Sequence, residues 1–156
     1  MNVAIVTGAG TGIGAATASR LSSSGYAVVL AGRRRALLDE VAGAIAAAGG
    51  RSLVVATDLA DPGAASRIVG EAVQAFGRID ALVNNAATIK VMPLAEFPLD
   101  VLDDHWAVNL RAPFLLIQAA LPHLRQSKGA IVNISSSSGT LVRPGQSVYG
   151  MTKANT

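Results

Sequence analysis

The sequence contains no cysteine and few aromatic residues. Without cysteine the chain forms no disulfide, no thiolate metal site and no redox-active thiol. Aromatic residues make up only 4% of the 156 positions, so Ala, Val, Leu and Ile must build the core that a 51% hydrophobic content allows. A chain of this length predicts a single domain, residues 1–156, and a reducing cytoplasm is its default location.

Long apolar runs and a strong charge of one sign are also missing. No run approaches the ~18 residues that a membrane-spanning helix needs, and the N-terminus lacks the features of a signal peptide. The net charge is only +3, and a nucleic-acid surface would need a longer basic stripe with interleaved aromatic residues. His105 and His123 lie eighteen residues apart, with no cluster of ligand residues that joins them, so both are expected to be surface or packing residues rather than metal ligands.

Short apolar segments rich in Val and Ile alternate with longer, alanine-rich helical segments. The apolar segments do not alternate with polar residues, which is typical of strands covered on both faces. Expected strands are Val3–Val6, Ala27–Ala31, Ser52–Ala56, Ala81–Asn84 and Ala130–Ser135. Expected helices are Gly12–Ser24, Arg35–Ala48, Pro62–Phe76, Leu99–Gln126 and one beginning near Ser147, with Asp61 as the cap before Pro62. This order predicts an α/β fold with a doubly wound, Rossmann-like parallel sheet.

A glycine-rich turn follows the first expected strand. Its spacing is Gly8-x3-Gly12-x-Gly14, which differs from the usual GxGxxG. Glycines let backbone amides and a helix N-terminus approach a pyrophosphate, whose negative charge the helix dipole favours. An ordinary strand-to-helix turn is the alternative. The density of glycines directly after the first strand favours a nucleotide site, with candidate residues Gly8, Thr11, Gly12, Ile13 and Gly14.

Arginines follow the second expected strand, where an NAD site usually places an acidic residue for the ribose 2′-hydroxyl. Arg33 and Arg34 stand there at the start of a helix, so their charge opposes the helix dipole. A 2′-phosphate would remove that penalty and give a guanidinium a bidentate partner. A solvated basic turn is the alternative, and we favour NADP(H) over NAD(H).

Two further strand ends carry candidate cofactor contacts. Asp58 and Leu59 follow the third strand, and Asp58 could accept a hydrogen bond from an adenine amino group or merely cap a turn. Asn85, Ala86 and Ala87 follow the fourth strand. Small residues there would let a cofactor ring and ribose lie against the backbone, and a tight Asn turn is the alternative.

A tyrosine–lysine pair lies near the end of the chain. Tyr149 and Lys153 are four residues apart, so they share one face of a helix. A phenol beside a fixed ammonium loses its proton more readily, which suits it to exchange a proton with an alcohol or a carbonyl. Upstream, Pro113 has no N–H, so the carbonyl of Asn109 loses its helical partner and could hold a water. A tolerated kink is equally compatible with this spacing.

Taken together, these residues resemble the short-chain dehydrogenases/reductases. The resemblance covers the whole chain, from Gly8-x3-Gly12-Ile13-Gly14 to Tyr149-x3-Lys153, and includes Asp58, Asn84–Ala86, Asn109 and Ile131–Ser136. It implies strand order 3-2-1-4-5. It also implies that the candidate cofactor residues named above contact the cofactor, and that Tyr149 and Lys153 do so as well. It also implies a catalytic tetrad of Asn109, Ser136, Tyr149 and Lys153, in which Ser136 is chosen because it lies thirteen residues before Tyr149.

The resemblance also assigns roles and a reaction. Tyr149 would exchange the proton in an NADP(H)-dependent interconversion of a carbonyl and a secondary alcohol. Lys153 would favour the deprotonated tyrosine and hold the nicotinamide ribose, while Ser136 would donate a hydrogen bond to the substrate oxygen. Asn109 would hold a water through its main-chain carbonyl. The loop Thr88–Met92 and the segment Thr140–Pro144 are candidates for contact with the small-molecule substrate.

The chain departs from the family pattern in two respects. Ala87 stands where Gly often follows Asn-Asn-Ala, and the strands and helices that usually follow the Tyr-Lys helix are not among the 156 residues. We therefore expect a sheet without the usual C-terminal strands, a homodimer or homotetramer only in a full-length form, and no activity of the chain alone. Alternatives are a non-catalytic NADP-binding module or inactive fragment, and a methyltransferase, which does not need the Ser136, Tyr149 and Lys153 set.

Overall fold

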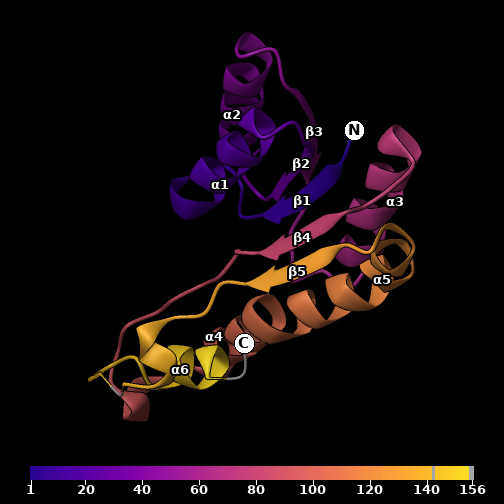
Figure 1. Ribbon diagram of the computed structural model, residues 1–156. Coiled ribbons are helices and arrows are strands. Elements are labelled where there is room, and N and C mark those ends of the chain that lie inside the picture. Colours follow the sequence, from indigo (N-terminus) through magenta and orange to yellow (C-terminus); the bar gives the residue numbers. More distant parts are fainter. Residues whose placement is uncertain (142, 155–156) are drawn as a thin grey trace.

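A computed structural model describes residues 1–141 and 143–154, in which strands and helices alternate (Figure 1). The strands are β1 (Val3–Thr7), β2 (Ala27–Gly32), β3 (Arg51–Ala56), β4 (Ala81–Asn84) and β5 (Ala130–Asn133). The α-helices are α1 (Gly12–Ser23), α2 (Arg35–Ala47), α3 (Ala64–Phe76), α4 (Leu99–Trp106), α5 (Ala112–Ser127) and α6 (Ser147–Lys153). Short 3₁₀ turns span Leu94–Glu96 (η1) and Ser137–Gly139 (η3), and a π-helical turn spans Ala107–Arg111 (η2).

The five strands form one parallel sheet in the order β3-β2-β1-β4-β5, as expected. Helices α1 and α2 cover one face, while α3 and α5 cover the other (Figure 1). The order reverses between β1 and β4, so their carboxyl ends flank the switch point at which ligands of such sheets bind. The fold is therefore Rossmann-like.

Strand β1 lies at the centre of the core, and all five of its residues are buried. Val3 and Ile5 pack with α3 and α5, whereas Val6 packs with α1 and α2, because successive side chains of a strand point to opposite faces. This two-sided burial explains the uninterrupted apolar sequence of the strand.

Strand β5 is an edge strand, and all four of its residues are exposed. Ile131 is 38% and Val132 is 48% exposed. The strand ends at Asn133 rather than at Ser135, because its partner β4 ends at Asn84, which pairs with Asn133. In the described residues no further strand pairs with the outer side of β5.

The expected helix Leu99–Gln126 is interrupted near Asn109. The amide of Ala112 donates to the carbonyl of Ala107, five residues earlier, so the break takes the form of a π-helical turn. Pro113 is the second residue of α5 and has no N–H to continue the α-helical pattern across this point.

The start of α3 was predicted wrongly. The helix begins at Ala64, and no side chain caps it. Instead the Oδ1 atom of Asp61 accepts a hydrogen bond of 2.9 Å from the amide of Gly63, and the Asp61 carbonyl accepts one of 3.0 Å from Ala64. Asp61 thus bonds the chain two residues ahead in a local turn that contains Pro62, and the turn replaces the first helical residues.

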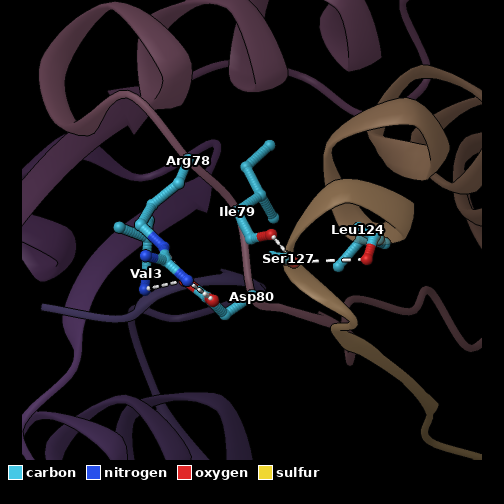
Figure 2. Close-up of polar contacts among 6 residues, drawn as sticks. All are labelled: Val3, Arg78, Ile79, Asp80, Leu124 and Ser127. Carbon is cyan, nitrogen blue, oxygen red and sulfur yellow. Dashed lines mark hydrogen bonds and ion pairs between the residues drawn. The ribbon is translucent and has the colours of Figure 1, made fainter.

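A cluster of polar contacts fastens the amino ends of β1 and β4, opposite the switch point (Figure 2). The carboxylate of Asp80 accepts hydrogen bonds from the Val3 amide at 2.8 Å and from Arg78 Nε and Nη2 at 2.9 and 2.6 Å. Ser127 Oγ donates to the carbonyl of Ile79 at 2.7 Å, which attaches the end of α5. Burial alone would raise the pKa of Asp80, but the hydrogen bonds from Arg78 and Val3 and the charge of Arg78 together hold it below its usual value.

Candidate active site at the carboxyl ends of the strands

A cleft of about 280 Å³ opens at the carboxyl ends of the strands. Turns that follow four successive strands contribute to it, together with one residue of η2. Its lining residues are Gly8, Gly10, Thr11, Gly32, Arg33, Arg34, Leu38, Asp58, Leu59, Asn85, Ala86, Ala87 and Val108. Nine of the predicted cofactor residues are among them, whereas Gly12, Ile13, Gly14, Tyr149 and Lys153 are not.

The glycine turn brings the start of α1 against the turn after β1. Gly8 has a positive φ of 65°, which favours glycine. A Cβ atom on Gly14 would overlap the carbonyl oxygen of Gly8 and lie 2.6 Å from Asn85 Nδ2. Helix α1 begins at Gly12 with no side-chain cap, so its first amides lack intrahelical partners and can bind an anion.

Thr7 ties the glycine turn to the turn after β4. Its Oγ1 atom accepts hydrogen bonds from the amides of Asn85 at 3.0 Å and Ala86 at 3.1 Å. Asn85 Nδ2 in turn donates to the Thr7 carbonyl at 2.9 Å. The Asn85 side chain is therefore part of the structure that shapes the cleft, a function that the sequence did not predict. The hydroxyl residue directly before Gly8 was the available signal.

The arginines after β2 differ from one another in their partners. Arg34 Nη2 donates to Thr11 Oγ1 at 3.2 Å, and Arg35 forms an ion pair of 3.4 Å with Asp39 on α2. Within residues 1–141 and 143–154, Arg33 forms no hydrogen bond or ion pair, and it lines the cleft just before α2. The charge of Arg33 is thus available to an anion in the cleft.

The turn after β3 borders the same cleft. Asp58 Oδ1 accepts a hydrogen bond of 3.0 Å from the amide of Ala60, so Asp58 caps this turn while it also lines the cleft. Arg111, on η2, donates to the carbonyl of Ala60 at 2.6 Å and also holds this turn. No sequence pattern connects Arg111 with Ala60, because the two residues are far apart along the chain.

Asn109 links three segments through its side chain. Its Oδ1 atom accepts a hydrogen bond of 2.8 Å from the amide of Thr88, and its Nδ2 atom donates to the Thr88 carbonyl at 2.9 Å and to Thr152 Oγ1 at 3.0 Å. The side chain is buried. The sequence suggested a role for the Asn109 main chain, but it did not predict this attachment of η2 to the loop after β4 and to α6.

Helix α6 is attached to the end of β5 through Lys153. This side chain is only 4% exposed, and its Nζ atom donates to the carbonyl of Ile134 at 2.6 Å. Burial lowers the pKa of the Lys153 ammonium below its usual value. Ser135 Oγ also donates to the Lys153 carbonyl at 3.1 Å, so the helix and the serine segment are held together at two points.

Two glycines let the serine segment pack closely on α6. A Cβ atom on Gly139 would lie 2.7 Å from the carbonyl oxygen of Lys153, and one on Gly150 would lie 2.6 Å from that of Ser138. Real Cβ contacts are longer, so larger residues would push η3 away from α6. The structure therefore brings the segments of Ser136, Tyr149 and Lys153 together, and the sequence had not singled out these two glycines.

The hydrogen bonds distinguish Ser136 from Ser135 and Ser138. Ser136 Oγ accepts a bond of 3.2 Å from the amide of Ser138, and no acceptor for its own proton is found in the described part of the chain. Ser135 and Ser138 instead donate their protons to the Lys153 carbonyl and to Gln146 Oε1. Ser136 can therefore donate to an added oxygen atom. Val142, within the segment Thr140–Pro144, lies outside the described residues.

Comparison with known proteins agrees with this geometry. The family model described as short chain dehydrogenase matches residues 2–156. The chain belongs to the short-chain dehydrogenase family. An uncharacterised oxidoreductase of Mycobacterium tuberculosis is 39% identical over 154 residues, which cover 97% of this chain and 59% of that protein. The chain thus spans little more than half the length of this curated relative.

Solved structures of short-chain dehydrogenases are closely similar. A metagenomic short-chain oxidoreductase in complex with NADP is 40% identical, with a TM-score of 0.93 over 97% of this chain and 70% of that one. A short chain dehydrogenase from Burkholderia cenocepacia in complex with NADP is 37% identical, with a TM-score of 0.93 over 98% of this chain and 63% of that one. In the described part of this family member, no helix has the length and apolar character to cross a bilayer, and no three potential metal ligands cluster.

Proposed function

We propose that this chain supplies the NADP(H) cleft and the proton-transfer groups of an oxidoreductase that interconverts a carbonyl compound and a secondary alcohol. The observation that carries the proposal is Arg33, which lines the cleft with no acidic partner in the described residues. Ala87 lines this cleft, and the next residue, Thr88, bonds Asn109, which in turn donates to Thr152 on α6. The cleft is thus connected to a second group, which includes the segments of Tyr149 and Lys153 and in which Ser136 has a proton to donate. This pairing fits an oxidoreductase better than a methyltransferase, which needs no such group.

The residues of the cleft fit a dinucleotide phosphate. Gly14 leaves room for the close approach of α1, whose free amides would face the pyrophosphate. Arg33 and Arg34 would bind the 2′-phosphate, and α2 has no acid in its first turn to compete for them. Asp58 and Leu59 would border the adenine, and Asn85–Ala87 would border the nicotinamide side. Several structural neighbours were crystallised with NADP, which supports this choice.

The second group would handle the proton and the substrate oxygen. When bound, the nicotinamide would supply or accept the hydride. Tyr149 would donate its proton to the carbonyl oxygen during reduction and remove it from the alcohol during oxidation. Ser136 would donate a hydrogen bond to the same oxygen, Lys153 would bind the nicotinamide ribose and stabilise the tyrosinate, and Asn109 would hold a water through its main-chain carbonyl.

A non-catalytic NADP-binding module is the second candidate. It is supported by the partial length of the chain, which covers only 59% of its relative from Mycobacterium tuberculosis. Both candidates require cofactor binding, and only the first requires turnover. A single domain, a cytoplasmic location and a homodimer or homotetramer of the full-length form belong to the first proposal.

Cofactor titration tests the binding of NADP(H), which both proposals require. NADPH should bind more tightly than NADH, and Arg33→Asp should reverse this preference. Arg35→Asp is the matched control, because it makes the same charge change at a residue that pairs with Asp39 and does not line the cleft. It should change the preference much less. Equal affinity of the unmodified chain for NADPH and NADH would refute the assignment of the 2′-phosphate site.

A further inference from the structure

His105 is a buried polar side chain that the proposed reaction does not use. It lies on α4, is 1% exposed and packs edge-on against the ring of Phe97. Its Nδ1 atom lies 2.7 Å from the carbonyl oxygen of Val101, and its Nε2 atom lies 3.0 Å from the amide nitrogen of Lys90. A carbonyl only accepts and an amide N–H only donates. The ring must therefore be neutral, with its proton on Nδ1.

The partner of Nε2 belongs to the loop between β4 and η1. Alternate amides of this loop are held by three different segments of the chain. Thr88 donates to Asn109 Oδ1 at 2.8 Å, Lys90 donates to His105 Nε2 at 3.0 Å, and Met92 donates to the Gly145 carbonyl at 3.0 Å. The loop has no helix or strand of its own between residues 85 and 93. His105 thus provides the middle of three attachments.

The two outer attachments lead to the proposed catalytic group. Asn109 bonds Thr152 on α6, and Gly145 lies just before α6. The cofactor side of the same loop is held independently, because Thr7 Oγ1 accepts from the amides of Asn85 and Ala86. A change at His105 should therefore move residues 88–92 and leave the cofactor cleft in place.

We propose that His105 is a positioning residue that fixes the loop 88–92 over the substrate side of the site. The term substrate side rests on the proposed function. The hydrogen bonds from which we infer the role of His105 do not depend on whether the chain turns over a substrate. The essential feature is the unprotonated Nε2 atom, which accepts a hydrogen bond from the amide of Lys90. The Nδ1–H group holds the ring in place by bonding within its own helix.

Two substitutions separate the two ring nitrogens. In His105→Gln the amide oxygen can reach the place of Nε2 and accept from Lys90. In His105→Asn the shorter amide reaches only the place of Nδ1. We expect the Asn variant to speed amide hydrogen exchange about two- to tenfold, the range for one lost hydrogen bond. The Gln variant should stay close to the unmodified chain.

The exchange pattern along the loop decides between positioning and a single local bond. Exchange is measured by NMR on the 156-residue chain, with ¹⁵N imidazole shifts and NADPH titration beside it. If His105 positions the loop, Thr88 and Met92 should exchange faster in the Asn variant although their own acceptors are intact. NADPH affinity should change less than about twofold, below the two- to tenfold loss expected from one missing hydrogen bond at the cleft.

Three results would overturn the proposal. The first is faster exchange at Lys90 alone, and the second is a proton on Nε2 in the imidazole spectrum. The third is an equal effect of the Gln and Asn variants at matched thermal stability. Failure of the unmodified chain to bind NADPH would refute the proposed function instead, and the exchange pattern would still decide whether His105 holds the loop.

Discussion

Replacement of Asp80 should destabilise the chain by removing the contacts at the amino ends of β1 and β4 (Figure 2). The Asp80 side chain is only 9% exposed, and it accepts the amide of Val3, which is itself buried. Asp80→Ala leaves this N–H without a partner, which costs about 1–3 kcal/mol. The lost bonds to Arg78 add less, because that side chain is about half exposed to solvent, which weakens the ion pair. We therefore expect a loss of about 2–4 kcal/mol in the free energy of unfolding.

Two further variants divide this loss between the contacts. Asp80→Asn keeps an oxygen that can accept from Val3, so it should retain most of the stability. Arg78→Ala removes the ion pair alone and should have a smaller effect than Asp80→Ala. The free energy of unfolding is measured by urea denaturation followed by circular dichroism. If Asp80→Ala and Arg78→Ala destabilised the chain equally, the buried Val3 amide would not be the main reason for the loss.

The contribution of the Asp80 carboxylate to the free energy of unfolding should depend on pH. Its pKa is lowered in the folded chain from the usual value of 3.8, so its contribution is complete above that value and is lost as the pH falls through the lower folded pKa. The stability difference between the unmodified chain and Asp80→Asn should therefore shrink as the pH falls below about 3.8. A difference that stays constant down to pH 2 would show that the charge of Asp80 does not contribute.

The remaining predictions concern the site and the chain as a whole. In any form that turns over, Tyr149→Phe should abolish carbonyl reduction while NADPH affinity stays nearly the same, and Lys153→Ala should lower both the reduction rate and the NADPH affinity. Retained turnover in the Phe variant would place the proton donor elsewhere. Gly14→Ala should abolish NADPH binding in a titration, because its methyl group would meet Gly8, while Gly43→Ala, in open space on α2, should leave binding unchanged. The 156 residues expressed alone should show no NADPH oxidation with a panel of carbonyl substrates, because they span only 59% of the length of the Mycobacterium tuberculosis relative. Tyr149-dependent turnover by a monodisperse preparation would contradict this.

Local sequence signals were sufficient for most of the fold. Continuous apolar segments located all five strands, because a parallel sheet covered on both faces needs them. The end of β5 and the start of α3 were missed. The first depends on where the partner strand β4 stops, and the second depends on a side chain that bonds a turn instead of a helix. Neither is visible in the spacing of residues along one segment.

The site shows the same division between local and distant contacts. The glycine turn, Arg33 and the Asn85–Ala87 turn follow their strands directly, so sequence order placed them at the cleft. The contacts of Asn109 and His105 join residues from different elements and could be found only in the folded chain. The assignment of catalytic and cofactor roles to these residues stays a prediction.

The π-helical turn η2 also sets the rotational phase of the helix that follows it. A π-turn is equivalent to one residue inserted into an α-helix, and one residue corresponds to about 100° of rotation. Beyond the turn, the buried residues of α5 recur at intervals of four, at Ala112, Leu116, Ala120 and Leu124. Before and within it, His105 and Asn109 face the loop after β4. Deletion of a single residue from η2 would restore regular helical hydrogen bonding, yet it would turn one of these two faces away from its partners.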